Sequence, residues 1–478
     1  MFKQRCFRLL LLASAIATSL SAAAYDFESA GIYYNITGDN TVEVTYSDRD
    51  NNTYSGSISV PETVTNNGTE YSVTKIGEYA FQGSAVTSVS MPECITSIGQ
   101  YACNECGSLE TVVLPTNLDD FSGWCIFRNC RNLKNIAIPE NVTEIPNGTF
   151  INCSSLAAIT IPQGVGEIGS NAFYGCSSLT SIEIPEGVKY LYEQVFYGCT
   201  ALESVKLPQN LLQIGNNCFY KCGALSDISL PSSIEIIAEG AFYNCENLAS
   251  PTLPASLRTL GKSAFQYCRN ITTIVLPDGV ASIPESCFYG CSSLESVTIP
   301  ESLTTLGDGA FSSCQSLKAI KIPSKVTAIP DYCFFACSSL ESVIIPEGVT
   351  AIGPSAFQSC KFNALTLPST ITSIGNYAFG KNNNLQSIIC SATIPPTLGD
   401  NAFSNGITPS IKVPISSIAV YKQANGWKNF TNYYGGDVVN NGITYRINEN
   451  DATITAAEAT ITEANVPSTV EFEGINIR

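Results

Sequence analysis

The sequence has no histidine among its 478 residues, and this absence excludes several kinds of site. Ser-His-Asp triads, the HExxH zinc helix and histidine ligation of haem all require an imidazole. Charged residues are scarce, at 14% of the chain, and acidic residues outnumber basic ones by 41 to 24. A net charge of −17 argues against the clustered Lys and Arg side chains that bind nucleic-acid phosphates. We therefore expect no enzyme, and no nucleic-acid partner.

Long apolar runs are also missing, because no stretch after the N-terminus reaches 18 apolar residues. We therefore expect no membrane span in the mature chain. The N-terminus itself has a basic start, an apolar stretch from Leu9 to Leu20, and the small residues Ala22 to Ala24. This order is typical of a secretory signal peptide that is removed by cleavage. We expect residues 1–24 to be that signal and the mature protein to be secreted or held at the cell surface.

What the sequence does contain is one unit, repeated many times. Its prolines recur at positions 92, 115, 139, 162, 185, 208, 231, 254, 277, 300, 323, 346 and 368, and ten of these twelve intervals are 23 residues. Between prolines the same residue types recur at the same offsets. In the unit that starts at Pro162 they are Val165, Ile168, Gly169, Phe173, Cys176, Leu179, Ile182 and Ile184.

The pattern of each unit predicts its local structure. The alternation Ile182-Glu183-Ile184 indicates a short strand, which the next proline ends because it has no amide hydrogen. The stretch from Asn171 to Cys176 indicates a tight 3₁₀ or single-turn helical segment with Phe173 and Cys176 directed inward. One unit buries almost nothing alone, whereas stacked units bury a continuous column. We predict a strongly β-dominated α/β solenoid of about 14 coils, with a 23-residue period and capped ends.

The Leu-x-x-Ile-x-Ile core of each unit is that of a leucine-rich repeat. The longer pattern LPDGVASIPESCFYGCSSLESVTIP, from Leu276 to Pro300, resembles the BspA-like bacterial subfamily of these repeats. The resemblance extends from about Pro61 to Pro414. It implies a surface or secreted protein that serves in adhesion or protein recognition, and it transfers no catalytic residue.

The ends of the array depart from the repeat, as expected for segments that cover open coils. We expect an N-terminal β cap over residues 25–60, the solenoid over 61–414 and a C-terminal cap over 415–434. Residues 435–478 repeat features of the N-terminal cap, so we interpret them as a partial second cap, expected to be poorly packed.

Local signals refine this picture of the ends. Asn66-Asn67-Gly68 predicts a hairpin turn inside an enlarged first unit. Residues 414–430 suggest a terminal amphipathic helix, with Trp427 as an apolar lid.

Twenty cysteines would ordinarily suggest disulfides in an exported protein. Their placement favours another role, because twelve occupy one repeat position: Cys106, Cys130, Cys153, Cys176, Cys199, Cys222, Cys245, Cys268, Cys291, Cys314, Cys337 and Cys360. We interpret these twelve as a structural ladder of buried free thiols. A few disulfides, or a metal or redox role, are the alternatives. We expect no metal site and no cofactor.

Two stripes of residues could bind a partner on the outside of the stack. The first is the outward strand position two residues before each proline, which includes Glu183 and Lys206 among small Ser and Thr side chains. The second follows the buried Phe and consists of Tyr174, Tyr197, Tyr220, Tyr243, Tyr289 and Phe335, with a break at Gln266. Each stripe has a simpler explanation: a solvated sheet for the first, and rings that pack on one another for the second.

The one 24-residue unit of the array, which starts at Pro115, contains Trp124 and the pair Asp119-Asp120. The extra residue predicts a local bulge. We expect Trp124 to fill the core and the two carboxylates to lie in a solvated loop.

Together these features predict an exported, non-enzymatic binding protein of the adhesin type, which recognises host or neighbouring-cell surface proteins through the faces of the solenoid. An extracellular protein is the expected partner, and a glycan is a possible one. The alternatives are a glycan- or mucin-binding surface protein and a structural scaffold of the envelope.

Overall fold

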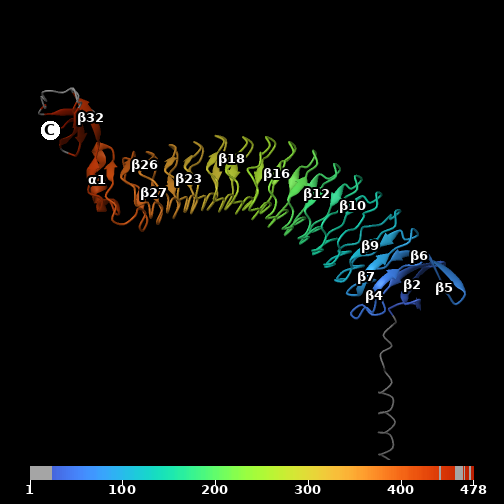
Figure 1. The fold of residues 1–478 in the computed structure, drawn as a ribbon. Helices are drawn as coiled ribbons and strands as arrows, with labels where there is room; N and C mark the ends of the chain where they lie inside the picture. The colour runs from blue at the N-terminus through green and yellow to red at the C-terminus, as the bar shows by residue number, and fades with distance from the viewer. Residues whose placement is uncertain are drawn as a thin grey trace, which may run out of the picture. The chain divides into compact units, whose positions relative to one another are not determined.

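The computed structural model describes residues 24–478, apart from 441–442, 450, 458–466, 468, 473–474 and 478. The expected signal peptide lies outside the described residues except for residue 24. The chain divides into two compact units, Met1–Leu179 and Thr180–Arg478. Each unit contains a stack of similar coils, where a coil is one 23-residue repeat (Figure 1). Within the described part of the chain, no helix is long and apolar enough to cross a membrane.

The first unit begins with a sheet of order β1-β2-β3-β6-β5. Its strands are β1 (Phe27–Ser29), β2 (Ile32–Gly38), β3 (Thr41–Thr45), β5 (Thr63–Asn66) and β6 (Thr69–Ile76). The antiparallel hairpin of β5 and β6 turns at Asn67 and Gly68, which have φ angles of 50° and 85°. This confirms the hairpin predicted at Asn66-Asn67-Gly68, because that turn type requires positive φ at both central residues.

The coils of the first unit pair in parallel on two sides of the stack. On one side lie β4 (Ser55–Ser59), β7 (Ala85–Ser90) and β9 (Thr111–Val113). On the other, β8 (Ser97–Ile98) pairs with β6, and β10 (Glu144–Ile145) pairs with β11 (Glu167–Ile168).

The second unit contains two rows of strands. The strands that precede each repeat proline, here called the pre-proline strands, are β12 (Ser181–Glu183), β14 (Ser204–Lys206), β18 (Thr273–Val275), β20 (Ser296–Thr298), β22 (Ala319–Lys321), β24 (Ser342–Ile344) and β26 (Ala364–Leu367). The row continues through β28 (Ser387–Cys390), β30 (Ser410–Lys412) and β31 (Tyr433–Tyr434).

The second row lies on another side of each coil and consists of two-residue strands. They are β13 (Tyr190–Leu191), β15 (Gln213–Ile214), β16 (Ile236–Ile237), β17 (Thr259–Leu260), β19 (Ser282–Ile283), β21 (Thr305–Leu306), β23 (Ala328–Ile329), β25 (Ala351–Ile352), β27 (Ser373–Ile374) and β29 (Thr397–Leu398). In each of them the second residue points into the core, and all but Leu398 are buried there.

Alternating side chains explain why the pre-proline strands form at this position. In β14, Val205 is buried whereas the flanking Ser204 and Lys206 are exposed. Its parallel partner β12 has the same pattern, and the register pairs Ser181 with Ser204 and Glu183 with Lys206. Equivalent residues therefore lie beside each other, as the period of 23 residues requires.

The third side of each coil differs from the helical segment expected from the sequence. Alternate amides, as in Phe219 and Lys221, donate to carbonyls of the following coil at 2.8 Å. The intervening amides of Tyr220 and Cys222 donate at 3.1 Å to carbonyls three residues back in their own coil. A helix would direct all of its amides back along its own chain. The observed segment is a chain of turns that bonds to its neighbour.

The core contains a ladder of phenylalanines. In the second unit the rings stack nearly parallel from Phe196 to Phe403, with neighbouring centroids 5.2–5.7 Å apart. Beside them the ladder cysteines are buried, and their thiols donate to phenylalanine carbonyls: Cys245 Sγ lies 3.1 Å from the carbonyl oxygen of Phe219. The column of like residues predicted from the repeat is therefore present.

The solenoid has about 16 turns, slightly more than the predicted 14, with a period of about 23 residues. Irregular terminal coils account for the difference. The turn that contains β29 lies beyond the last of the regularly spaced prolines, Pro368, so proline spacing alone does not reveal it.

The C-terminal helix is shorter than expected and broken. Three short segments replace it: the 3₁₀ turn η1 (Ile415–Ser417), the helix α1 (Ile418–Gln423) and the 3₁₀ turn η2 (Trp427–Asn429). Ala424 is extended and Gly426 has a φ of 79°, so the helix ends before the tryptophan. Trp427 is completely buried and its indole N–H donates to the carbonyl of Pro396 at 2.8 Å.

The tail contains a second antiparallel sheet of β32 (Gly436–Asn440), β33 (Ile443–Ile447) and β34 (Ala452–Ala457), followed by the hairpin of β35 (Val470–Phe472) and β36 (Ile475–Ile477). Ile443, Tyr445 and Ile447 are at most 2% exposed. The expectation of poor packing is therefore wrong for β33, because its alternation buries one face.

Trp124 corrects another expectation. Its side chain is 57% exposed, so it does not fill the core. The extra residue of this coil is Ser122, which separates the core position at Phe121 from Gly123, the counterpart of Gly99 and Gly169 in other coils. Phe121 occupies the buried position instead, at 4% exposure.

Candidate binding surface

The pre-proline strands of the second unit carry an uncovered row of side chains, here called the strand face. It consists of the outward positions of consecutive coils, which are exposed except for the half-buried Ser250. Its members are Ser181, Glu183, Ser204, Lys206, Asp227, Ser229, Ser250, Thr252, Thr273, Val275, Ser296, Thr298, Ala319, Lys321, Ser342, Ile344, Ala364 and Thr366. Most of these side chains are small, so another surface could approach the sheet closely.

Two large aliphatic side chains stand on this face. Val275 is 62% exposed and Ile344 is 60% exposed, although the same strands have buried positions available for apolar residues. Between Asp227 and Lys321 no outward position of the strand face is charged. Depletion of charge is the feature that this stretch shares with the core of a protein interface.

Ion pairs between coils lie beyond and beside the uncharged stretch. Lys206 Nζ lies 2.6 Å from a carboxylate oxygen of Glu183, and Lys318 Nζ lies 3.0 Å from one of Glu295. The hydrogen bond to Glu183 raises the pKa of the Lys206 ammonium group. Such exposed pairs contribute little stability. Glu183 and Lys206 thus form one cross-coil ion pair at the edge of the face.

The tyrosine row is the second predicted surface, and its rings lie against one another. Tyr197 and Tyr220 stack with centroids 4.6 Å apart, and Tyr220 and Tyr243 with centroids 4.4 Å apart. All three side chains are half-buried. Parallel stacking at these distances occupies the ring faces, so edges and hydroxyl groups are what the row presents to solvent.

The tyrosine row was expected to be interrupted at Gln266, but the next residue, Tyr267, continues it. Tyr267 packs edge-to-face on Tyr243 at 5.6 Å and on Tyr289 at 5.3 Å, so the row continues through this coil. The sequence pattern missed Tyr267 because it is one residue out of register with the other tyrosines. Phe335 lies further along and packs on Tyr332 at 5.9 Å. Tyr174 belongs to the first unit and is half-buried.

The tyrosine row carries little charge of its own. Burial raises the pKa of Tyr220, Tyr243 and Tyr267, so their hydroxyl groups remain protonated at neutral pH. Lys221 places its ammonium group 5.4 Å from the centre of the Tyr220 ring. The row can therefore offer hydroxyl donors, but it contains no group poised for acid or base chemistry.

The ladder cysteines of the second unit offer no reactive centre. Burial raises the pKa of the Cys291 and Cys337 thiols to about 12, so they stay protonated. No disulfide joins the 19 described cysteines. Nor do the described residues contain a group of three or more His, Cys, Asp or Glu side chains that could hold a metal ion.

Comparison with solved structures gives relatives of the same architecture. A leucine-rich repeat protein from Bacteroides ovatus is 30% identical, with a TM-score of 0.66 over 86% of this chain and 100% of that one. A leucine rich cell surface protein from Faecalibacterium prausnitzii is 27% identical, with a TM-score of 0.47 over 76% of this chain and 94% of that one. No curated protein matches the sequence.

A family model agrees with the repeat pattern. The model of the BspA type leucine rich repeat region, which spans six copies, matches residues 50–157, 123–249, 212–338 and 310–426. These overlapping matches cover most of the chain and include both rows of strands and the phenylalanine ladder. The chain therefore belongs to the BspA type leucine-rich repeat family.

Proposed function

We propose that this protein is an exported, non-enzymatic binding protein that recognises a surface protein of a host or a neighbouring cell through the strand face of its second unit. The observation that carries the proposal is the exposure of Val275 and Ile344 among small, mostly uncharged side chains. Burial of these aliphatic groups would favour association, and the surrounding Ser and Thr side chains could bond to a partner.

The predicted signal peptide and the family support this function in different ways. A signal peptide over residues 1–24 would deliver the chain outside the cell, where a surface partner is available. Repeat proteins of this kind bind along their continuous outer faces, because stacking uses the interior. The buried, protonated thiols and the absence of histidine give no support to a catalytic role.

Glycan capture along the tyrosine row has less support from the geometry. Sugars stack on exposed aromatic faces, but the faces of Tyr197, Tyr220 and Tyr243 are already occupied by one another. The ring edges and hydroxyl groups could still contribute to a protein interface.

The test uses the full mature chain and a panel of immobilised extracellular matrix proteins and cell-surface glycans. We expect binding to at least one protein, and a loss of at least tenfold in affinity for the double variant Val275→Lys/Ile344→Lys. The matched control is Thr259→Lys/Ala328→Lys, which adds the same charges at exposed positions of the two-residue strands. Equal binding by the two variants would contradict the strand face, and silence of the whole panel would favour a structural scaffold.

A further inference from the structure

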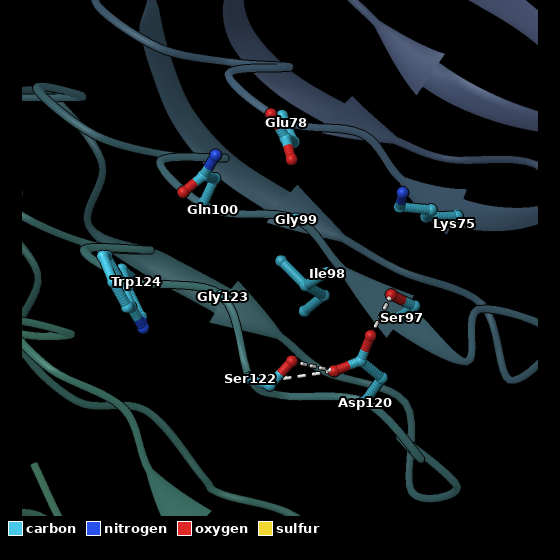
Figure 2. Close-up of a pocket in the computed structure, with 10 residues that line it drawn as sticks. All are labelled: Lys75, Glu78, Ser97, Ile98, Gly99, Gln100, Asp120, Ser122, Gly123 and Trp124. Atoms are coloured by element: carbon cyan, nitrogen blue, oxygen red, sulfur yellow. Dashed lines mark hydrogen bonds between the residues drawn. The ribbon is translucent and has the colours of Figure 1, made fainter.

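A pocket of about 290 Å³ lies on the outside of the first unit, around the 24-residue coil (Figure 2). Trp124 stands at one side, Lys75, Ser97 and Asp120 at the other, and Ile98 lies between them. Glu78 and Gln100 complete the wall. The volume is near the lower end of small-molecule sites, which begin at roughly 300 Å³. The pocket is separate from the strand face, which belongs to the second unit.

Trp124 occupies a repeat position that is polar in the neighbouring coils. The residues at this position in the preceding and two following coils are Gln100, Asn147 and Ser170. The indole is 57% exposed, and among the described residues no ring or cation lies against it. An indole in a position that the fold fills with short polar side chains is not needed for packing. Its exposed surface is free to receive the apolar face of a ligand.

The backbone floor of the pocket depends on glycine. A Cβ atom at Gly99 would lie 2.7 Å from the amide nitrogen of Glu78, and one at Gly123 would lie 2.8 Å from that of Gln100. A Cβ atom at either position would force the backbone to shift. Glu78, Gln100 and Trp124 each follow a closely packed glycine, at the same place in three consecutive coils.

Asp120 is held in a fixed orientation opposite the indole. Its carboxylate accepts hydrogen bonds from Ser97 Oγ at 3.0 Å and from the amide of Ser122 at 3.1 Å, and also from the Ser122 hydroxyl. The Ser122 hydroxyl is the main cause that lowers the pKa of Asp120, which is ionised at neutral pH. A preorganised carboxylate of this kind is a strong acceptor for hydroxyl groups.

The other polar side chains of the pocket have donors and acceptors available for a ligand. Within the described residues, the Glu78 carboxylate, the Gln100 amide and the Trp124 indole N–H make no side-chain hydrogen bond. Lys75 pairs with Glu43 at 3.3 Å and retains donors for a further bond. The pocket thus combines an aromatic surface with carboxylate acceptors and with amide, indole and ammonium donors.

We propose that this pocket binds one neutral saccharide unit of a glycan, with the sugar ring packed on Trp124 and its hydroxyl groups bonded to Asp120 and Gln100. A sugar has both an apolar C–H face and many hydroxyl groups, which suits an aromatic surface beside carboxylate and amide groups. Anionic ligands fit less well, because Glu78 and Asp120 would repel them and Lys75 is already paired.

The experiment uses tryptophan fluorescence of the full mature chain, because its two tryptophans differ completely in exposure. Trp124 is 57% exposed and Trp427 is fully buried, so acrylamide quenching reports on Trp124. The probes are the methyl glycosides of glucose, galactose, mannose and N-acetylglucosamine, and their short oligosaccharides. We expect saturable protection from quenching with at least one of them, at millimolar or tighter affinity.

Variants of the pocket residues and matched controls test whether the saccharide binds at Trp124. Binding of the same saccharide, measured by calorimetry, should weaken at least tenfold in Trp124→Asn and in Asp120→Asn. Trp124→Tyr should retain it, and so should Tyr190→Asn, which removes an exposed aromatic residue elsewhere. Circular dichroism should show unchanged folding, because Trp124→Asn only reproduces the residue of the next coil.

Absence of a saturable response across the whole panel would overturn the proposal. So would unchanged binding by the folded Trp124→Asn variant, or a response to inorganic phosphate or Ca²⁺ alone. Because the pocket and the strand face are on different units, Trp124→Asn should leave the binding of a protein partner unchanged. The two proposals can therefore fail independently.

Discussion

Each ladder cysteine supplies a buried hydrogen-bond donor as well as apolar volume. The carbonyl of Phe219 accepts from the thiol of Cys245, and the same geometry recurs where the next repeats are cysteine. At the one later coil where the ladder position is Asn382, its amide donates to the carbonyl of Phe357 at 2.8 Å. The carbonyl of Phe219 also accepts from the amide of Cys222 at 3.1 Å, so the ladder side chain adds a second donor to it from the next coil. The position therefore favours a short side chain with a donor, which is satisfied inside the core.

Reactivity of the thiols follows from this burial. In the native protein we expect Cys94 and Cys125, which are only half-buried, to react with a thiol reagent, whereas the ladder thiols do not. In guanidinium all 19 described thiols should react. A colorimetric thiol assay under both conditions measures this, with Cys94→Ser/Cys125→Ser as the variant that loses native reactivity. Recovery of far fewer thiols after denaturation would show disulfides instead.

The same burial makes the protein sensitive to alkali. The pKa of the Cys291 and Cys337 thiols rises to about 12 in the folded state, above the ordinary thiol value. Below that ordinary value both states hold the proton, so these thiols leave stability unchanged with pH. Above it the unfolded chain releases protons that the folded chain retains, and the free energy of unfolding falls. Denaturant titrations at pH 8 and pH 11 should show a lower midpoint at pH 11, by less in a Cys291→Ala/Cys337→Ala variant.

The positions of some single residues could be predicted from the sequence, and those of others could not. The repeat position of the cysteines and the strand position of Lys206 could be predicted, because each recurs with the period. Trp124 could not, since a lone tryptophan was assumed to be apolar filling. Its alignment with Gln100 and Asn147, which are both polar, was the available signal for exposure.

At the scale of the element, the turn segments combine left-handed residues with coil-to-coil hydrogen bonds. Two positions of each segment have positive φ, and many are not glycine: Lys221 has a φ of 61° and Ala336 a φ of 57°. The left-handed conformation costs roughly 1–2 kcal/mol for an ordinary L-residue. The hydrogen bonds to the next coil, such as that of Ala336 to Gln358 at 2.8 Å, compensate for this strain.

Relief of the strain should stabilise the protein. We expect Ala336→Gly to raise the free energy of unfolding by about 0.5–1 kcal/mol, after the entropy that glycine loses on folding is subtracted. The matched control is Gly309→Ala, where φ is 60° and the nearest atom to an added Cβ is 3.7 Å away. That variant should lose about 1 kcal/mol without any clash. Chemical denaturation measures both, and a shift of the two variants in the same direction would contradict the explanation.

Strands could be predicted from the sequence more reliably than turns. Alternation around Val205 and the following proline specify a strand without knowledge of neighbours. The turn segment could not be predicted in this way, because its hydrogen bonds depend on a coil 23 residues away. The predicted terminal helix was too long. It ends early because Gly426 has a left-handed backbone and Trp427 is buried.

At the scale of the whole molecule, the 23-residue period determines which residues of neighbouring coils pair. Within the second unit, Gln213 pairs with Ile236 and Ile236 with Thr259, each exactly one repeat further along. Every coil contacts mainly the coil before and the coil after it, so stability is close to a sum over coils and their interfaces. A whole repeat should therefore be removable, whereas a fraction of a repeat should not.

Deletion of Pro231–Leu253 tests this directly, because it removes 23 residues and joins Leu230 to Pro254. Ile214 would then face Leu260, and Phe219 would stack on Phe265, with the same residue types in register. We expect a folded protein that loses about 1–3 kcal/mol, the share of stability expected for 23 residues. Deletion of Pro231–Phe242 removes only 12 residues and places the strand position of one coil against the turn position of the next. That variant should unfold or aggregate in circular dichroism and thermal denaturation. If it were as stable as the 23-residue deletion, stacking in register would not be what holds the molecule together.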